Sequence, residues 1–453
     1  MSAEGSAKVD PSVRVHFGTD GVRGVAGEVL TASLAVSIGA AATREVGGER
    51  PRVLLIRDTR ESGEMLESAL AAGIASAGGD VLLGGVLPTP AAPLLVARYG
   101  LDLAAVISAS HNPYEDNGIK FFGADSFKLS DATELAIEAR MSFPCGGPSR
   151  AIGTIRTLHG THEDYLRALQ TRFAGLDLSG VDVALDCANG ATYRAAPEIF
   201  HRLGATVTVL ADAPDGRNIN DGCGSTHTGP LVAAMRDGGH DVGFAFDGDG
   251  DRLLAVDRRG AVVDGDELIA LAALHLRAQD RLPGGGVAVT VMTNYGFHTA
   301  MRDAGVEVAT TQVGDRYVLE ELRERGWGLG GEQSGHIIDM GFVASGDGIA
   351  SALLTLEALA GADLADRHAM DKLPQRLVNV RVADRDDAMS NPELLAASGR
   401  EGVALEGRGR VLVRSSGTEQ LVRVMVEAPS DDEADAVCGR LVAIVESIAG
   451  PAA

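Results

Sequence analysis

The sequence of 453 residues contains little lysine and few aromatic residues. Lysine and arginine together number 40, against 63 acidic residues, so the net charge is −23. Only four residues are lysines: Lys8, Lys120, Lys128 and Lys372. A nucleic-acid-binding surface needs a basic excess, so this balance argues against a nucleic-acid partner. It leaves room for a small phosphorylated ligand, because salt screens exposed charges over about 8 Å and local side chains decide what binds.

Cysteines and long apolar segments are also scarce. The four cysteines lie far apart with no Cys-x-x-Cys pair, which fits a reducing compartment and predicts neither disulfides nor a zinc site. The longest uncharged run, residues 81–97, contains three prolines and is unlike a membrane-spanning helix. The first 15 residues are polar and lack the apolar segment of a signal peptide. We therefore expect a cytoplasmic protein with no membrane partner.

Short aliphatic runs alternate with Ala- and Leu-rich stretches over most of the chain. This alternation predicts parallel α/β layers, arranged in three similar blocks of roughly 100 residues each. The predicted strands are 52–57, 81–83, 103–108, 181–185, 206–210, 286–292 and 306–309, and the predicted helices are 64–77, 195–203 and 297–304.

The C-terminal part has a different pattern. It predicts three strands, over 376–382, 408–414 and 421–427, and then a helix. Ser430, followed by Glu433 three residues later, is typical of a helix start. We therefore expect a smaller α+β domain here. The predicted domains are residues 1–158, 159–257, 258–372 and 373–453.

The most specific motif is the acidic run from Asp247 to Arg252, Asp-Gly-Asp-Gly-Asp-Arg, which follows an apolar stretch. Three carboxylates at alternate positions of a tight loop repel each other unless a hard divalent cation lies among them. Arg252 and Arg258 stand where a calcium-binding EF-hand would need Gly and Glu, so a calcium sensor is disfavoured. A site with few ligands and room for substrate oxygens suits Mg²⁺. The alternative interpretation is a solvated acidic turn.

A second motif, Ser108-Ala-Ser-His-Asn-Pro113, follows a predicted strand and continues to Lys120. In open α/β sheets, ligands bind at the carboxyl ends of the strands. Ser110, next to His111, has the position of a nucleophile. The G-x-S-x-G turn of a serine hydrolase is absent. Taken alone, the Asn-Pro pair is also compatible with a plain turn.

Three further loops offer polar groups. Gly331–His336 presents Glu, Ser and His between glycines, which suits sugar hydroxyls, although a plain loop is an equal alternative. Arg414–Glu419, with Arg423 beyond it, combines arginine, small hydroxyl residues and glycine as a phosphate site does. Phe17–Gly24 is a glycine-spaced loop that offers Arg23. Neither a Walker A motif nor a convincing dinucleotide fingerprint occurs, so a nucleotide cofactor is not supported.

In this order, the five motifs resemble those of the α-D-phosphohexomutase superfamily over residues 15–448. The segments FGTDGVRG, ISASHNPYEDNGIKFFG, DGDGDR, VGDRYV, GGEQSGH and SGTE…VRVMVE are most similar to the bacterial branch that acts on glucosamine phosphates. The resemblance implies an α/β fold: three similar α/β domains with mixed or parallel sheets and a smaller C-terminal α+β domain. The four domains would surround a central cleft, to which each contributes one loop.

The resemblance also implies roles for individual residues. Ser110 would be a phosphoserine that donates and recovers a phosphoryl group, and one Mg²⁺ per subunit would lie between its phosphate and Asp247, Asp249 and Asp251. Arg23 and Lys120 would flank the transferred group. Lys120 is our first candidate for proton transfer and His336 the second, with His111 beside the nucleophile. The residues expected to bind substrate are Glu332, Ser334, His336 and Arg252 near the sugar, and Arg414, Ser416, Gly417, Thr418 and Arg423 at the distal phosphate.

Three positions depart from the pattern of many relatives. Ser415 and Gln420 replace two prolines that flank the phosphate loop, which predicts a looser loop. Gln312 replaces a lysine before Val-Gly-Asp-Arg, and this leaves Arg316 as the expected cation of that segment.

The activity implied is an isomerase that interconverts glucosamine 6-phosphate and glucosamine 1-phosphate, feeding UDP-N-acetylglucosamine and cell-wall synthesis. Glucosamine or glucose 1,6-bisphosphate would serve as intermediate or activator. We expect a hinge near residues 370–376, and a homodimer through the first domain. The alternatives are a phosphomannomutase/phosphoglucomutase with the same mechanism and an inactive sugar-phosphate-binding protein. An inactive protein should lack a nucleophile or metal residue, and this sequence retains them all.

Overall fold

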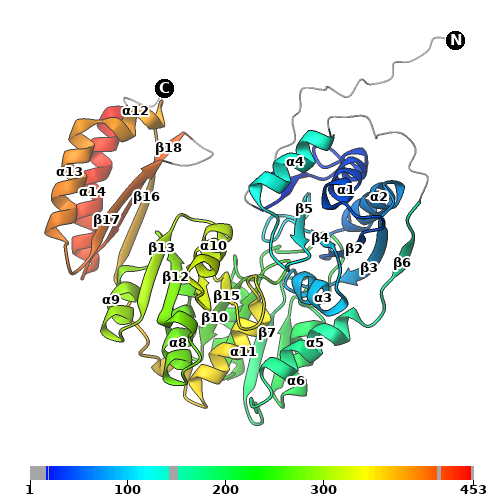
Figure 1. Ribbon diagram of the computed structural model, residues 1–453. Helices are drawn as coiled ribbons and strands as arrows, with labels where there is room; N and C mark the ends of the chain where they lie inside the picture. Colours follow the sequence, from blue (N-terminus) through cyan, green and yellow to red (C-terminus); the bar gives the residue numbers. More distant parts are fainter. Residues whose placement is uncertain (1–16, 19, 142–151, 416–419, 450–453) are drawn as a thin grey trace.

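The computed structural model describes residues 17–18, 20–141, 152–415 and 420–449, which form four lobes in an arc (Figure 1). The first lobe lies at the right of Figure 1, the second and third at the bottom, and the fourth at the left. Each lobe contains one sheet of its own.

The first lobe contains a six-stranded sheet in the order β1-β5-β4-β2-β3-β6. Strand β2 runs parallel to β3 and β4, whereas β5 is antiparallel to both β4 and β1. Its elements are β1 (Val22–Val25), α1 (Ala32–Val46), β2 (Arg52–Arg57), α2 (Gly63–Ser76), β3 (Asp80–Val86), α3 (Ala91–Tyr99), β4 (Leu103–Ile107), β5 (Asp116–Gly123), α4 (Asp131–Met141) and β6 (Ile155–Thr157).

Strand β2 shows why this sheet is buried on both faces. Val53 and Leu55 belong to one apolar cluster, and Leu54 and Ile56 belong to another. Successive side chains of a strand point to opposite faces, so a continuous aliphatic run implies helices on both sides.

The second and third lobes contain sheets of five and four strands, in the orders β11-β10-β9-β7-β8 and β13-β12-β14-β15. The second lobe comprises α5 (Thr161–Arg172), β7 (Asp182–Asp186), α6 (Ala195–Arg202), β8 (Thr206–Leu210), α7 (Gly229–Gly238), β9 (Val242–Phe246), β10 (Leu253–Asp257) and β11 (Val262–Val263). The third comprises α8 (Gly265–Ala278), η1 (Pro283–Gly285), β12 (Gly286–Thr290), α9 (Tyr295–Asp303), β13 (Glu307–Thr311), α10 (Asp315–Arg325), β14 (Leu329–Gly331), β15 (Ile337–Asp339), α11 (Gly348–Leu359) and η2 (Leu364–Asp366).

These three lobes repeat one strand arrangement. In each, a central strand has parallel neighbours on both sides: β2 between β3 and β4, β7 between β8 and β9, and β12 between β13 and β14. In each, the next strand then returns antiparallel, as β5, β10 and β15 do. The loop before that returning strand contains Ser110, Asp247 or Glu332. The prediction of three similar α/β blocks is therefore confirmed, and equivalent loops carry their candidate residues.

The fourth lobe is the predicted smaller α+β unit. Its sheet is antiparallel in the order β16-β18-β17 and has its own apolar core. The Oγ of Ser430 accepts a hydrogen bond from the Glu433 N–H at 3.3 Å, which confirms the predicted helix start. The elements are β16 (Gln375–Arg381), α12 (Arg385–Ser390), α13 (Pro392–Ala404), β17 (Arg410–Ser415), β18 (Leu421–Glu427) and α14 (Asp431–Ala449).

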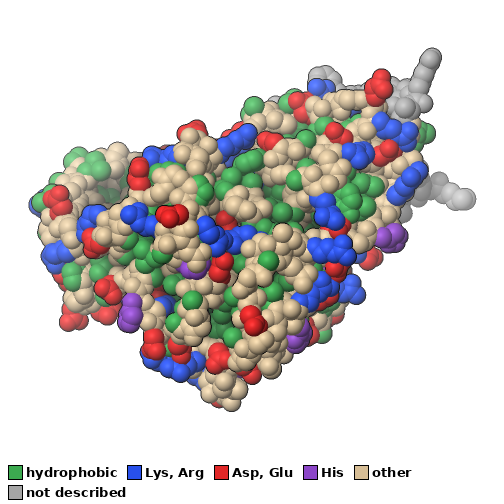
Figure 2. All heavy atoms as spheres, turned by 60° about the horizontal axis from the view of Figure 1, so that its bottom comes forward, with side chains coloured by type: hydrophobic (Ala, Val, Ile, Leu, Met, Phe, Trp, Pro, Cys, Tyr) green, Lys and Arg blue, Asp and Glu red, His purple; other side chains and the backbone are tan. Residues whose placement is uncertain are grey.

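The lobes differ in how they are joined. One apolar cluster runs continuously from the first lobe to the third and includes Val106, Phe246 and Phe297. The core of the fourth lobe is separate from it. Figure 2 shows one face of the molecule, on which acidic and basic side chains are interspersed. In the part of the chain that the structure describes, no helix has both the length and the apolar character needed to cross a membrane.

Candidate active site

The candidate nucleophile lies in the loop that joins β4 to β5. Ser110 is only 1% exposed, and its Oγ donates a hydrogen bond to Oδ2 of Asp247 at 2.6 Å. Its Oγ also lies 3.3 Å from Nδ1 of His111. Burial, together with Arg252 and Arg23, lowers the pKa of His111 to about 4. The ring is therefore neutral near pH 7 beside the hydroxyl.

The three aspartates after β9 form a compact acidic cluster. Carboxylate oxygens of Asp247, Asp249 and Asp251 lie within 4.8 Å of one another, and all three side chains are buried. Within the described residues, Oδ1 of Asp249 and Oδ1 of Asp251 have no hydrogen-bond partner. Burial, together with Asp251 and Asp249, raises the pKa of Asp247 well above its usual range. Buried, converging and partly unsatisfied carboxylates are the donor set that a hard divalent cation needs.

Glycine lets this acidic loop approach the nucleophile. A Cβ atom at Gly248 would lie 2.5 Å from the Ser110 carbonyl oxygen. Real Cβ atoms do not come so close, so any larger residue would push the two loops apart. The glycine spacing of the acidic motif therefore has a steric cause in addition to its turn geometry.

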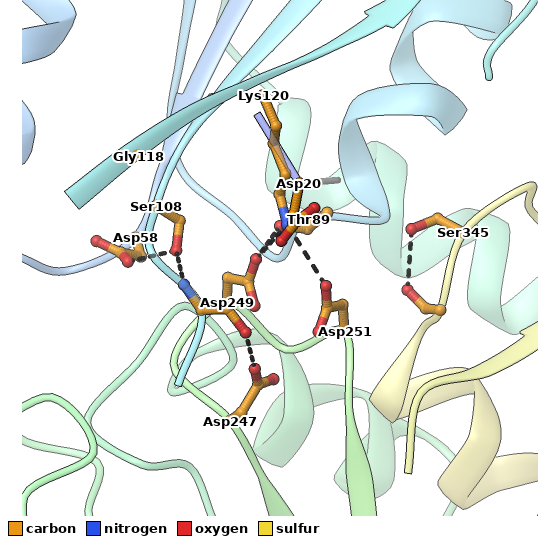
Figure 3. Close-up of polar contacts among 12 residues, drawn as sticks. Asp20, Asp58, Thr89, Ser108, Gly118, Lys120, Asp247, Asp249, Asp251 and Ser345 are labelled. Carbon is orange, nitrogen blue, oxygen red and sulfur yellow. Dashed lines mark hydrogen bonds and ion pairs between the residues drawn. The ribbon is translucent and has the colours of Figure 1, made fainter. Parts of the chain in front are cut away.

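Lys120, on β5, reaches the same cluster from the first lobe. Its Nζ lies 2.7 Å from Asp249, 3.4 Å from Asp251 and 4.0 Å from Asp20, and Figure 3 shows it above the aspartates. Burial disfavours the charged ammonium, but Asp20, Asp249 and Asp251 outweigh this effect and raise the pKa of Lys120. The hydroxyl of Thr89 also donates to Oδ2 of Asp249, at 2.6 Å.

The third lobe contributes His336 from the loop between β14 and β15. Its Nδ1 lies 3.6 Å from Asp251, and its Nε2 accepts a hydrogen bond from the Gly346 N–H at 3.1 Å. Burial disfavours the charged ring, but Asp251 and Asp315 raise the pKa of His336. In the same loop, Oε1 of Glu332 accepts the Gly314 N–H at 3.1 Å, and Ser334 is exposed.

Two arginines complete the surroundings of the cluster. Arg23 pairs with Asp20, and Arg252 lies 4.0 Å from Asp251. Among the described residues, the Nε atoms of both arginines are buried without a hydrogen-bond partner. Such unused donors are free to bind an anion.

The fourth lobe carries a pair of arginines on neighbouring strands. Arg414 of β17 stands opposite Arg423 of β18 in the sheet. Burial and the nearby Arg423 lower the pKa of Arg414, and the Nε of Arg423 is buried with no partner in the described chain. An anion between two adjacent cations stabilises both of them, and a phosphate group is such an anion. Ser416, Gly417 and Thr418, predicted to bind phosphate, lie outside the described residues.

In the segment after β13, Arg316 was the expected cation, because Gln312 replaces a lysine. Gln312 is exposed, and Arg316 is 8% exposed. The Arg316 guanidinium pairs with Glu134 at 2.8 Å and with Asp131, both on helix α4 of the first lobe. Arg316 therefore joins two lobes, while its Nε is buried with no partner among the described residues, so its expected role as the cation of this segment stays a prediction.

The structure also adds site residues that the motifs did not indicate. Thr89 follows β3 and Arg60 follows β2, so both lie at the carboxyl ends of parallel strands. Asn220 comes from the second lobe and donates to the carbonyl oxygens of Ser110 and Asn112. The available signal for Thr89 and Arg60 was a polar residue within a few positions of the carboxyl end of a parallel strand. No sequence signal indicated Asn220, because its partners lie about 110 residues away.

Family models match the chain in four consecutive parts. They are described as phosphoglucomutase/phosphomannomutase alpha/beta/alpha domain I (residues 14–143), domain II (163–260), domain III (264–377) and C-terminal domain (377–444). The chain belongs to this family. The phosphoglucomutase/phosphomannomutase fold thus accounts for the three repeated α/β lobes and the separate fourth lobe.

Within the family, curated relatives cover nearly the whole chain. A phosphoglucosamine mutase of Moorella thermoacetica is 50% identical over 94% of this chain and 98% of its own. A phosphoglucosamine mutase of Pelotomaculum thermopropionicum is 48% identical over 96% and 99%.

Solved structures share the fold. A phosphoglucomutase/phosphomannomutase family protein from Burkholderia thailandensis has a TM-score of 0.82 at 26% identity, covering 96% of this chain and 98% of its own. N-acetylphosphoglucosamine mutase of Aspergillus fumigatus, in complex with GlcNAc-6P and magnesium, has a TM-score of 0.69 at 19% identity, covering 97% of each chain.

Proposed function

We propose that this protein is a phosphoglucosamine mutase, an isomerase that interconverts glucosamine 6-phosphate and glucosamine 1-phosphate. One observation carries the proposal: the buried Ser110 hydroxyl, 2.6 Å from Asp247, faces three converging carboxylates. A serine in that position is suited to phosphoryl transfer, in which positioning and charge neutralisation matter more than covalent chemistry. The full-length relatives named phosphoglucosamine mutase support the choice of sugar.

The proposed cycle uses Ser110 as a phosphoserine. The Oγ–P bond breaks as a sugar hydroxyl oxygen bonds to phosphorus, and the hydroxyl proton leaves to a base. The sugar is then a 1,6-bisphosphate, which turns over within the site. Its other phosphoryl group returns to Ser110, which regenerates the phosphoserine and releases the isomer. Added glucosamine or glucose 1,6-bisphosphate would also phosphorylate an unmodified enzyme.

Asp247, Asp249 and Asp251 would hold one Mg²⁺ per subunit. When bound, this ion neutralises charge on the oxygens of the Ser110 phosphate. The chain supplies the remaining cations. Lys120 reaches the cluster from β5, and its raised pKa keeps it positively charged beside the reacting oxygens. Arg23, on β1, offers a free Nε donor.

Proton transfer at the sugar hydroxyl needs a group near the cluster, and such transfer contributes about 10²–10⁴-fold. Lys120 stays the first candidate, because its ammonium can donate a proton to the departing Ser110 oxygen, and the resulting neutral amine can then accept the proton of the sugar hydroxyl. His336 is the second, since its ring lies beside Asp251. His111 lies beside the nucleophile, with its Nδ1 3.3 Å from the Ser110 Oγ, whose proton is already donated to Asp247.

The remaining residues are assigned to substrate binding. Glu332, Ser334 and His336 would contact sugar hydroxyls, with Arg252 nearby. Arg414 and Arg423 would bind the distal phosphate, together with the loop of Ser416, Gly417 and Thr418.

The domains would be residues 1–158, 159–257, 258–372 and 373–453. A homodimer through the first domain, a cytoplasmic location and a role in supplying UDP-N-acetylglucosamine for the cell wall belong to the same proposal.

The test compares turnover of glucosamine, glucose and mannose phosphates by the purified protein, with mass analysis of the peptide that contains Ser110. We expect phosphate on Ser110, fastest turnover of glucosamine phosphate, and no turnover after Ser110→Ala. The matched control is Ser37→Ala, a partly exposed serine of α1 whose hydroxyl donates to the Ser33 carbonyl oxygen, and it should change nothing. Faster turnover of mannose or glucose phosphate would favour the phosphomannomutase/phosphoglucomutase alternative. Binding of sugar phosphate without any turnover would identify an inactive binding protein.

A further inference from the structure

Ser110 has an unusual backbone. Its φ is +52°, in the left-handed region that residues with a side chain seldom adopt. A conformation of this kind persists only where surrounding contacts hold it. The contacts of this loop therefore decide which way the Ser110 hydroxyl points.

Arg60 supplies most of these contacts. Its side chain is fully buried, and all five of its N–H donors have partners. The Nε donates to Asp58 Oδ2 at 2.8 Å, and the two terminal nitrogens donate only to backbone carbonyl oxygens of the serine loop. Those oxygens belong to Ser110, Asn112 and Asp116, each at 2.9 Å, and to Pro113.

Asp58 holds the backbone N–H of Ser110, through the hydroxyl of Ser108. Its Oδ2 accepts a hydrogen bond from the Ser108 hydroxyl at 2.6 Å, and the Ser108 oxygen accepts the Ser110 N–H at 3.0 Å (Figure 3). The Asp58 Oδ1 accepts the Arg60 N–H at 3.0 Å. The N–H and the C=O of Ser110 are therefore both tied to one buried ion pair.

The second lobe reinforces the same carbonyl groups. The amide of Asn220 donates to the oxygens of Ser110 and Asn112, at 3.0 and 3.1 Å. These are two of the oxygens that Arg60 binds. Because no donor of Arg60 is left over, its guanidinium has no hydrogen bond to offer a substrate phosphate.

We propose that Arg60, with Asp58, is a positioning residue that holds the loop so that the Ser110 hydroxyl faces Asp247. The inference rests on the proposed role of Ser110 as nucleophile. Lysine cannot replace Arg60, because an ammonium is a compact charge and cannot reach four carbonyl oxygens and a carboxylate in one plane. The consequence is a loss in kcat with little change in substrate affinity, since the sugar and distal phosphate contacts stay intact.

The experiment measures kcat and KM for glucosamine 6-phosphate in full-length Arg60→Lys. A misplacement of about 1 Å at a reacting group costs about 10²-fold, so we expect kcat to fall by about that factor and KM to stay within about threefold. A crystal structure of the variant should show Ser110 released from positive φ. Arg172→Lys is the matched control, because Arg172 is also largely buried and paired with Asp339 and Glu357, but contacts neither catalytic loop. Its kcat should be unchanged.

Asn220→Ala and Ser108→Ala are measured in parallel, so that the positioning role can still be tested if the Arg60 variant misfolds. Each removes one contact to the Ser110 peptide unit, and each should lower kcat by about tenfold or more without raising KM. If the variants kept full kcat, or if Ser110 kept its φ in them, the positioning role would be overturned. If wild-type protein showed no mutase activity, the proposed function would fail, and the Ser110 backbone in the variants would then decide the positioning role.

Discussion

Asp247 is the residue of the acidic cluster whose ionised form is disfavoured. Its raised pKa, caused by burial and by Asp251 and Asp249, favours the protonated carboxyl when no metal is bound. Asparagine has the shape and neutrality of that form. We therefore expect Asp247→Asn to unfold at nearly the wild-type temperature in chelator. It should lose the stabilisation by Mg²⁺, which is about 2.7 kcal/mol at a hundred times Kd.

Thermal unfolding with Mg²⁺ and with chelator measures this difference directly. Asp237→Asn, an exposed carboxylate on α7, is the control and should retain the magnesium effect. A full magnesium shift in Asp247→Asn would contradict the metal assignment. Undiminished wild-type activity in chelator would contradict it as well.

Replacing Arg423 tests whether the fourth lobe binds the distal phosphate. A hydrogen bond to a charged group contributes about 1.5–3 kcal/mol, so Arg423→Met should lower kcat/KM about 10- to 100-fold. Steady-state kinetics with glucosamine 6-phosphate checks this. Arg408→Met, an exposed arginine of the same lobe paired with Glu433, should have no effect on kcat/KM. Equal kinetics for the two variants would remove Arg423 from the substrate site.

At the scale of elements, helix α8 begins at a buried acid. Oδ2 of Asp266 accepts the Asn294 N–H at 2.8 Å, and burial, with Asp264 nearby, raises the pKa of Asp266 to about 7. The unfolded chain releases this proton near pH 4. Between about pH 4 and 7 the folded state thus binds more protons, so stability from this group is complete below pH 4 and lost as pH rises through 7.

Asp266→Asn should remove this slope. At 1.36 kcal/mol per pKa unit, the contribution is at most about 4 kcal/mol, so wild type should lose stability between pH 5 and pH 8 and the variant should lose less. Urea unfolding at both pH values measures it. Asp303→Asn, largely exposed on α9, should keep the wild-type slope. A slope in Asp266→Asn as steep as in wild type, or steeper, would contradict the assignment.

Strands that consist of aliphatic residues followed the sequence pattern closely. The predicted strands 206–210 and 421–427 match β8 and β18, whereas strand 286–292 ends at Thr290. Strand β5 was not predicted, because Asn117, Gly118 and Lys120 do not fit a buried strand by composition. Pairing with β4 and β1 imposes the extended conformation there. Tertiary context overrides strand propensity in this way.

At the scale of the whole molecule, Lys128 joins two lobes through buried charges. Its Nζ lies 2.6 Å from Asp20 in the first lobe and also pairs with Asp315 in the third. Removing one partner of a buried ion pair costs about 3–5 kcal/mol. Asp315 loses its lysine, whereas Asp20 keeps Arg23 as a partner, so Lys128→Met should lower the free energy of unfolding by about 3 kcal/mol, the lower end of that range.

Lys372 provides the matched control, because it pairs with Asp264 but is 37% exposed. Exposed pairs contribute about 0–1 kcal/mol, so Lys372→Met should change stability little. Denaturant unfolding of both variants measures the difference. A small loss in Lys128→Met, equal to that of Lys372→Met, would show that this contact does not hold the lobes together.

Polar contacts join the fourth lobe to the third. The side chain of Asn294 donates to the Leu373 carbonyl oxygen and accepts the Leu373 N–H, both at 3.0 Å. Arg410 donates to the Thr293 carbonyl oxygen at 2.5 Å. Since the apolar cores of the two lobes are separate, rotation near residues 370–376 would leave both intact. The predicted hinge stays a prediction, and this arrangement is compatible with it.

The sequence by itself determined the α/β alternation, the α+β character of the C-terminal part, and the motif residues Ser110, Lys120, Asp247, Asp249 and Asp251. Local pattern suffices for these, because hydrophobic periodicity and glycine spacing are properties of neighbouring residues. Tertiary structure decided the contacts that hold them: Arg60 and Asn220 on the Ser110 carbonyl, Thr89 on Asp249, and Arg316 turned toward α4. Those contacts join residues far apart in the chain, often through backbone atoms, and backbone atoms carry no sequence signal.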